Sequence, residues 1–225
     1  MSGPRVLITG FGPFPGVPDN PSAWLAEALA GETRGVAGTL QAEILPTSWE
    51  SVAALTPSLF EVLKPEIMIH FGLCQRAQGF RIERSAHNRV ARRADIGGAL
   101  PASDAVLAEG PARLDTEFPA ASLAAYLRAH GLEAAVSRSA GRYLCNFLYY
   151  RALAWASRQD RPTIAVFVHI PQRAAHGGAC SEAELLRGAQ ETLRFVLDLP
   201  ARESRTRETL SAVPLAVSES LRQDA

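Results

Sequence analysis

Apolar residues along this chain follow two kinds of spacing, and the two kinds alternate from one end to the other. Short apolar runs of the kind that form buried strands occupy residues 5–10, 40–45, 66–71, 133–137 and 163–170. Longer stretches with apolar residues at helical spacing occupy residues 22–30, 49–63, 119–130, 142–158 and 181–197. Strands that alternate with helices in this way predict an α/β fold, in which helices cover both faces of a sheet.

Two predicted helices carry recognisable end signals. Asn20 and Pro21 precede the helix over residues 22–30, where Asn caps free backbone N–H groups and Pro suits the first turn. Gly131 follows the helix over residues 119–130, and glycine commonly ends a helix. These signals support the predicted positions of both helices.

Two segments do not follow the alternation. Residues 95–118 contain several glycines and prolines and no sustained apolar period. A connection of this length in a compact domain is more often functional than idle, so we predict a lid over a site there. Residues 200–225 are rich in Arg, Glu and Ser, and Pro214 interrupts their only apolar patch. We expect one domain over residues 1–199 and a peripheral C-terminal extension over residues 200–225.

Charge and hydropathy argue against several classes of partner. The chain of 225 residues has 23 basic and 23 acidic side chains, so it has no overall field that would hold nucleic acid or an anionic membrane. No apolar run reaches the roughly 18 residues needed to span a bilayer. Residues 1–5 lead directly into a predicted strand, which leaves no room for a signal-peptide core. We expect a cytoplasmic protein that binds neither nucleic acid nor membrane.

The three cysteines, Cys74, Cys145 and Cys180, form no close CxxC pair. An odd number of cysteines argues against a secreted disulfide framework, and the missing pair argues against a zinc ribbon. His70 and Cys74 have a spacing like that of metal ligands, but two ligands without a third make a weak site. We therefore expect at least one free thiol and no bound metal.

Residues 8–16 read ITGFGPFPG and follow a predicted strand, as a glycine-rich dinucleotide loop does. Pro13 and Pro15 remove two of the backbone N–H groups that such a loop points at phosphate, and Phe11 and Phe14 crowd the approach. Nucleotide binding is therefore disfavoured. Two interpretations remain open: a tight turn with two core phenylalanines, or two aromatic walls beside a pocket at the carboxyl end of the strand.

A cysteine and a histidine suggest nucleophilic chemistry. Cys145 lies in about the first turn of a predicted helix, where the helix N-terminus stabilises a thiolate, although a core cysteine is the common alternative. His169 ends an apolar strand just before Pro171, where a buried structural histidine is also common. If the two preceding strands are neighbours that end at the same sheet edge, the thiol and the imidazole form a nucleophile and its base.

Glu83 is the candidate acid that would orient the imidazole, because it follows soon after the predicted strand over residues 66–71. Arg81 and Arg84 flank it, and a surface ion pair is the alternative interpretation. The sequence around Glu83 does not decide between these two roles.

Together these motifs resemble those of the type I pyroglutamyl peptidases, which are cysteine peptidases that remove an N-terminal pyroglutamyl residue. The resemblance runs from about residue 6 to residue 197 and consists of four blocks in the same order and spacing. The blocks are Gly10-Phe11-x-Pro13-Phe14 with Gly16 and Asn20-Pro21-Ser22, His70-x-Gly72 with Glu83-Arg84 and Asn88, Ser139-Ala140-Gly141 with Cys145-Asn146, and His169 before Pro171.

The resemblance implies a role for each candidate residue. Cys145 would attack the pyroglutamyl carbonyl, and His169 would take the thiol proton and pass it to the departing amine. Glu83 would hold the imidazole. Phe11 and Phe14 would clasp the flat, uncharged lactam ring, which aromatic faces can grip.

The resemblance also implies that Arg93 helps to bind the developing oxyanion, together with the backbone N–H of Cys145. The family has a three-layer α/β/α sandwich fold around a twisted, mostly parallel sheet, and needs no cofactor. Its substrates are N-terminally pyroglutamylated peptides, and many of its bacterial and archaeal members are homotetramers.

The chain departs from the family pattern at two places that border the expected pocket. Arg76 stands one position earlier than the family's arginine, and Ala77 occupies that arginine's place. Around Arg93 the chain reads ARRAD over residues 91–95, where the family tends toward Asp-Ala-Arg-Ile-Pro-Asp. A second hypothesis is therefore a protein of the same fold that binds a lactam or a related small molecule without turnover.

Overall fold

The structure is a computed structural model and describes residues 3–32 and 39–199. The predicted C-terminal extension over residues 200–225 lies outside the described residues. Within the described ranges, strands and helices alternate in the order that the apolar pattern predicts, with three additional short strands.

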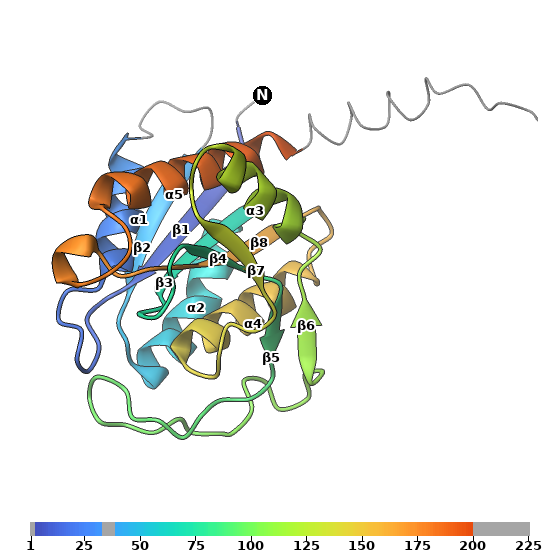
Figure 1. Cartoon of the computed structure of the whole chain (residues 1–225). Coiled ribbons are helices and arrows are strands. Elements are labelled where there is room, and N and C mark those ends of the chain that lie inside the picture. Colours follow the sequence, from blue (N-terminus) through green and yellow to red (C-terminus); the bar gives the residue numbers. More distant parts are fainter. Residues whose placement is uncertain (1–2, 33–38, 200–225) are drawn as a thin grey trace, which may run out of the picture.

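Six of the described strands form one sheet in the order β2-β1-β3-β8-β4-β7 (Figure 1). These strands are β1 (Arg5–Phe11), β2 (Thr39–Leu45), β3 (Ile67–Leu73), β4 (Phe80–Glu83), β7 (Ala134–Ser137) and β8 (Ile164–Ile170). Neighbouring strands run parallel except β4 and β8, which run antiparallel. The predicted mostly parallel sheet is therefore confirmed.

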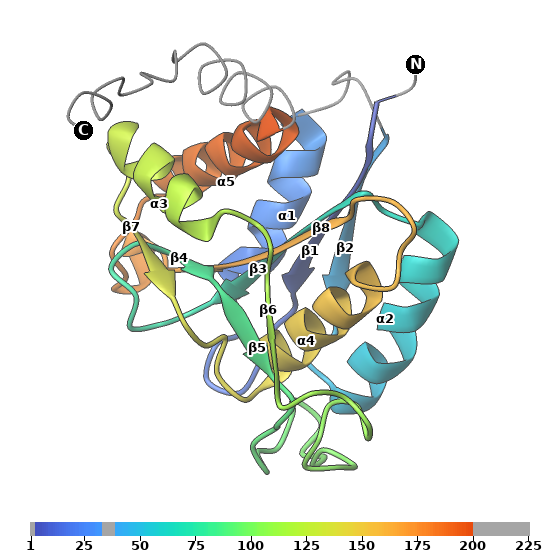
Figure 2. The ribbon, with the colours of Figure 1, turned by 90° about the vertical axis from the view of Figure 1, so that its right-hand side faces the viewer.

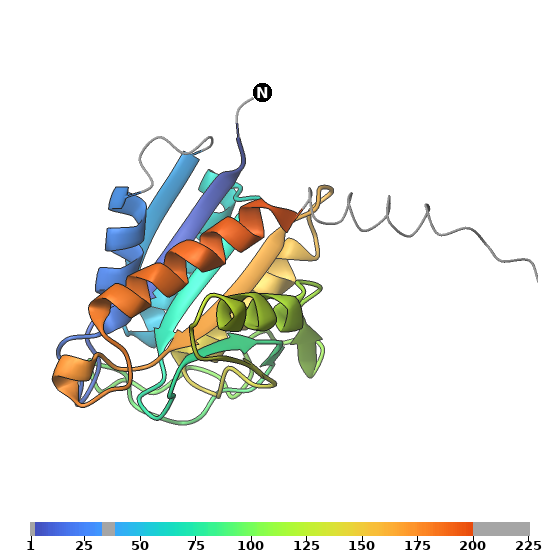
Figure 3. The ribbon, with the colours of Figure 1, turned by 45° about the horizontal axis from the view of Figure 1, so that its top comes forward.

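Helices cover both faces of this sheet, so the molecule has three layers (Figure 2). Helices α1 (Pro21–Glu32), α3 (Ala120–Ala129) and α5 (Glu182–Leu197) lie on one face, which Figure 3 shows from their side. Helices α2 (Trp49–Leu63) and α4 (Leu144–Ala156) lie on the other face. The predicted α/β/α sandwich is confirmed, and each face of the sheet packs its own apolar core.

Side chains of β8 alternate between these two cores. Val166 and Val168 pack toward α1, α3 and α5, whereas Ala165 and Phe167 pack toward α2 and α4. Successive side chains of a strand point to opposite faces of its sheet, so His169 shares a face with Phe167. The candidate base therefore lies on the side of the sheet that α4 covers.

The end signals of both helices are confirmed. The backbone N–H of Ser22 donates to Oδ1 of Asn20 at 3.1 Å, which caps the start of α1. Gly131 follows α3 with φ of 71°, a left-handed conformation that favours glycine. Local sequence therefore determines where these two helices begin or end.

The apolar pattern missed three short strands, β4, β5 (Ser85–His87) and β6 (Arg113–Asp115). Strands β5 and β6 pair with each other as a separate antiparallel ribbon. Each missed strand has three or four residues and mixes apolar with charged or polar side chains. So few residues show no measurable period, and their strand conformation depends on partners far away in the sequence.

The apolar pattern indicated no regular element over residues 95–118. The structure differs, because β6 lies within this segment. Its start is held by Asp95, whose carboxylate accepts backbone N–H groups of Trp49, Gly97 and Ala99 at 2.9–3.0 Å. Its middle is held by Asn88, whose side chain accepts from the backbone of residues 106 and 107. These bonds attach the segment to the domain near α2 and β5.

Candidate active site

Cys145 is the second residue of α4, as expected from the sequence, and its side chain is half-buried. The thiol lies over β3 at Gly72, because a Cβ atom added to Gly72 would come within 2.9 Å of Cys145 Sγ. Gly72 is the register partner of His169 on the parallel strand β8. The absent side chain at Gly72 therefore leaves the space that the thiol occupies beside the histidine.

His169 forms hydrogen bonds with both other candidate residues. Its ring is hydrogen-bonded to the side chain of Cys145, and its Nδ1 lies 2.7 Å from Oε1 of Glu83. Because Glu83 occupies Nδ1, Nε2 is the ring nitrogen that faces the thiol. The structure thus brings Cys145, His169 and Glu83 together in one chain of hydrogen bonds.

The position of Glu83 follows from the register of β4 against β8. Glu83 pairs with Phe167 and Arg81 pairs with His169, so Glu83 and His169 are diagonal neighbours on the same face of the sheet. Glu83 is fully buried, which excludes the alternative of a surface ion pair. Arg81 instead donates to Oγ of Ser137 at 3.0 Å.

Cys145 and His169 do not meet for the reason expected from the sequence. Strand β7, which precedes Cys145, is separated from β8 by β4 and runs antiparallel to β8. The two strands are therefore not neighbours, and they do not end at the same edge of the sheet. Instead, α4 packs across β8 and β3, and its first turn lies over the carboxyl ends of these strands.

The ionisation of His169 reflects these neighbours. Burial by itself lowers the pKa of His169. The negative charge of the Cys145 thiolate and the hydrogen bond that the imidazolium donates to it, followed by the hydrogen bond to Glu83 and the charge of Glu83, raise this pKa to about 10. The imidazolium is therefore the stable form near neutral pH when the thiol is ionised. A thiolate beside an imidazolium is the nucleophilic state of a cysteine.

Two buried side chains of α4 that the sequence did not single out for a role support this arrangement. The Tyr149 hydroxyl donates to the backbone carbonyl of Glu83 at 2.9 Å. The Asn146 side chain accepts from the backbone N–H of His87 and donates to its carbonyl, each at 2.8 Å. Tyr149 stands four residues after Cys145, so helical spacing is the signal that could have placed it on the same side of the helix.

Phe11 and Phe14 both lie at the carboxyl end of β1. Phe11 is buried in the core to which Cys145 also packs, and its backbone N–H donates to Oγ of Ser22 at 3.0 Å. Phe14 is half-buried and forms a two-way backbone bridge with Val17. Their contact with a lactam ring stays a prediction.

Arg93 is exposed on the segment that follows β5. Its guanidinium lies 4.9 Å from the centroid of the Tyr143 ring, and Tyr143 is the residue that precedes α4. Its backbone carbonyl accepts from the indole N–H of Trp49 at 2.9 Å. This arrangement fixes the main chain at Arg93 near the start of α4, and its part in oxyanion binding stays a prediction.

His70 and Cys74 do not form part of a metal cluster. In the described part of the chain, no three His, Cys, Asp or Glu side chains are grouped closely enough to hold a metal ion. His70 is bonded through Nδ1 to Oγ1 of Thr9 at 2.8 Å, and burial lowers its pKa to about 3, so that it is neutral at pH 7. None of the described helices is long and apolar enough to cross a membrane.

Replacing Gly72 by alanine should move the thiol out of line with the imidazole. The new methyl group would lie 2.9 Å from Cys145 Sγ and 2.8 Å from Cζ of Phe167, so at least one of these groups must shift. Displacing a reacting atom by about 1 Å costs on the order of a hundredfold in rate. We expect kcat to fall about ten- to a hundredfold, with the melting temperature recorded for the same samples.

Gly31→Ala is the matched control, because Gly31 lies in α1 and has no atom near its added Cβ. It should retain the kcat of the unmodified enzyme. Unchanged kcat in Gly72→Ala would contradict the positioning role of this glycine.

The chain matches the family described as Pyroglutamyl peptidase over residues 4–176. It is 34% identical over 206 residues to a pyrrolidone-carboxylate peptidase of Cupriavidus taiwanensis, which covers 88% of this chain and 95% of that protein. It is 32% identical over 168 residues to one from Pyrococcus furiosus, covering 74% and 80% of the two chains.

Solved structures agree with the sequence matches. The pyroglutamyl peptidase I of Bacillus amyloliquefaciens superposes with a TM-score of 0.76 and 27% identity, over 84% of this chain and 94% of that one. The pyrrolidone carboxyl peptidase of Thermococcus litoralis superposes with a TM-score of 0.77 and 27% identity, over 89% and 96% of the two chains.

Proposed function

Because the chain belongs to the pyroglutamyl peptidase family, we propose that Cys145, His169 and Glu83 together hydrolyse the amide bond after an N-terminal pyroglutamyl residue. The observation that supports this assignment is the continuous hydrogen-bonded chain from the thiol through the imidazole to a fully buried carboxylate. The protein is a cysteine peptidase of the pyroglutamyl type.

The reaction proceeds through a thioester. The thiolate of Cys145 attacks the pyroglutamyl carbonyl carbon, and the carbonyl oxygen takes up the negative charge. His169 gives its Nε2 proton to the departing amine as the carbon–nitrogen bond breaks. A water molecule then attacks the thioester while neutral His169 takes one of its protons, and the sulfur leaves as a thiolate. This step releases pyroglutamate and restores the thiolate beside the imidazolium.

Glu83 and the residues around α4 act on the groups that react. The carboxylate of Glu83 holds the Nδ1 proton of His169, which orients the ring and stabilises its charged form. The backbone N–H of Cys145, at the N-terminus of α4, and the guanidinium of Arg93 receive the developing oxyanion. The contact of the Arg93 guanidinium with the ring of Tyr143, the residue that precedes α4, supports this role.

Phe11 and Phe14 give the site its preference for a lactam. A pyroglutamyl ring is flat and uncharged, so aromatic rings can cover it without burying an unpaired charge. A free N-terminal residue would bring a protonated amine into the same space, and that charge would lose its hydration without gaining a partner. Selection therefore depends on the absence of charge at the substrate's N-terminus.

The two other functions considered from the sequence are not favoured. A lactam-binding protein without turnover does not need a thiol, a base and a buried acid in contact. A nucleotide loop needs free backbone N–H groups. In this loop the backbone N–H of Phe11 already donates to Oγ of Ser22. The backbone N–H groups of Gly12 and Phe14 donate to the carbonyls of Leu45 and Val17, respectively.

We further propose that the catalytic unit is a single domain over residues 1–199 and that the protein acts in the cytoplasm. It assembles as a homo-oligomer, with a tetramer expected from the family resemblance. The free thiols of Cys74, Cys145 and Cys180 suit the reducing conditions of that compartment. Size-exclusion chromatography with light scattering tests the assembly.

The activity is tested with two fluorogenic amides that differ in one group. Pyroglutamyl coumarinyl amide should be hydrolysed, whereas prolyl coumarinyl amide, which has the same ring size but a protonated amine, should be cleaved at least about a hundredfold more slowly. Equal rates for the two amides would contradict the proposed specificity. Saturable binding of the pyroglutamyl amide with no release of coumarin would contradict the proposed reaction.

A further inference from the structure

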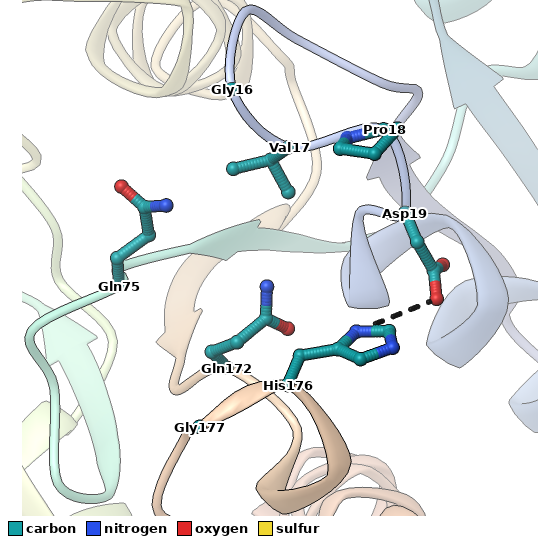
Figure 4. Close-up of a pocket in the computed structure, with 8 residues that line it drawn as sticks. All are labelled: Gly16, Val17, Pro18, Asp19, Gln75, Gln172, His176 and Gly177. Atoms are coloured by element: carbon teal, nitrogen blue, oxygen red, sulfur yellow. Dashed lines mark ion pairs between the residues drawn. The ribbon is translucent and has the colours of Figure 1, made fainter.

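A pocket that the reaction described above does not use opens at the carboxyl ends of β1, β3 and β8 (Figure 4). Its volume is about 570 Å³, which is large enough for several residues of an extended peptide. It is lined by Gly16, Val17, Pro18, Asp19, Gln75, Gln172, His176 and Gly177. The lining comes from the loop after β1, the turn after β3 and the segment around the 3-10 helix η1 (Ala174–His176).

The pocket and the candidate nucleophile lie at the same edge of the sheet. Gln75 stands three residues after Gly72, and Gln172 stands three residues after His169. Gly72 and His169 are register partners, and Cys145 Sγ lies over Gly72. An extended peptide spans about 3.5 Å per residue, so the substrate residues that follow the first amide bond can run from the thiol along this edge of the sheet toward the pocket.

The walls of the pocket are fixed by one buried arginine. The guanidinium of Arg173 pairs with Asp19 at 2.5 Å and with Glu182 at 3.0 Å, and it lies over the ring of Trp24. These contacts join the loop after β1, the segment before η1 and the start of α5. The shape of the pocket therefore exists before a ligand binds.

Two glutamine amides face this space. Figure 4 shows the side chains of Gln75 and Gln172 both directed toward the loop that carries Val17. Oε1 of Gln172 accepts the backbone N–H of Arg173 at 2.9 Å, which turns the NH2 group of Gln172 outward. Gly178 packs against the backbone of Gln172, since an added Cβ would come within 1.8 Å of the Gln172 carbonyl oxygen. The amide of Gln172 is thus held in place, whereas the amide of Gln75 can adjust its position.

The side chains that line the pocket suit the backbone of a peptide better than a charged side chain. A peptide backbone alternates N–H donors with C=O acceptors, and a primary amide offers both kinds of group. The one carboxylate in the lining, that of Asp19, already faces Arg173, and His176 lies 3.7 Å from it. No uncompensated charge remains in the lining to select a charged side chain.

We propose that this pocket binds the main chain of the second and third residues beyond the scissile bond of a pyroglutamyl peptide, through the amides of Gln75 and Gln172. The inference rests on the proposed function, because it supplies the part of the same substrate that leaves as the amine. Binding in this pocket makes the enzyme prefer longer peptides over short pyroglutamyl amides, without selecting particular side chains.

The test compares two substrates and two sets of variants. The substrates are pyroglutamyl-alanine amide and pyroglutamyl-trialanine amide, in which blocked C-termini remove any difference in charge. For Gln75→Ala with Gln172→Ala, kcat/KM for the longer substrate should fall about five- to thirtyfold, mainly through KM, since two hydrogen bonds to main chain are lost. For the short substrate it should change less than twofold.

Gln78→Ala is the matched control, because Gln78 is an exposed glutamine of the same turn that does not line the pocket. It should leave both substrates unchanged, and Gln75→Ala alone gives the same comparison should the double variant be unstable. An equal loss on both substrates, or no loss on either, would overturn the pocket's role. If the unmodified protein cleaves neither substrate, the proposed function itself fails, and this inference fails with it.

Discussion

Serine in place of Cys145 should reduce kcat/KM for a pyroglutamyl amide by at least about ten-thousandfold, which is the scale of losing a catalytic nucleophile. The hydroxyl is close in size to the thiol, so the contacts of the side chain with Gly72 and His169 are nearly preserved. A hydroxyl ionises far less readily than a thiol, and His169 therefore has no stable anion to pair with. The change should abolish chemistry while leaving the melting temperature within a few degrees.

Cys74→Ser is the control for this result, because Cys74 is also a half-buried free thiol and directly follows β3. It should keep nearly full activity. Labelling with iodoacetamide at pH 7 gives an independent readout, in which Cys145 should react much faster than Cys74 or the buried Cys180. Full activity in Cys145→Ser, or equal labelling of all three thiols, would remove Cys145 from the reaction.

Replacing Glu83 by glutamine should lower kcat about ten- to a thousandfold, less than loss of the nucleophile, since an orienting acid is less critical than the group that it orients. The amide fits the same buried space but carries no charge. In the described structure Oε2 of Glu83 has no hydrogen-bond partner, so the interaction through Oε1 with His169 is what compensates the buried carboxylate. Removing the charge therefore acts mainly on the ionisation and orientation of His169.

The pH profile separates this role from a structural one. Glu83 contributes to the raised pKa of His169, so the glutamine variant should lower that pKa. Activity requires the imidazolium beside the thiolate, and the alkaline limb of the bell-shaped profile should move to lower pH. Glu66→Gln, at the opposite end of the sheet where Glu66 pairs with Arg161, should leave the profile unchanged. Full kcat with an unshifted profile in Glu83→Gln would exclude Glu83 as the acid.

The sequence alone determined the layers of this protein and the place of most elements. The spacing of apolar residues predicted strands β1, β2, β3, β7 and β8 and the five α-helices of residues 3–32 and 39–199. That spacing records which face of each element is buried, and it can be recognised within a single element. For the same local reason the sequence placed Cys145 at the start of a helix and His169 at the end of a strand.

Only the tertiary structure decided how the candidate residues meet. Glu83 and His169 lie 86 residues apart, and their contact depends on the register of β4, a strand of four residues that the apolar pattern did not reveal. The sequence suggested that neighbouring strands would bring Cys145 to His169, whereas the path of α4 and the space above Gly72 do so. The residues that share a pocket with Gln172 likewise come from separate loops. Periodicity specifies which face of an element is buried, but register and crossing between distant elements are set by how whole surfaces pack.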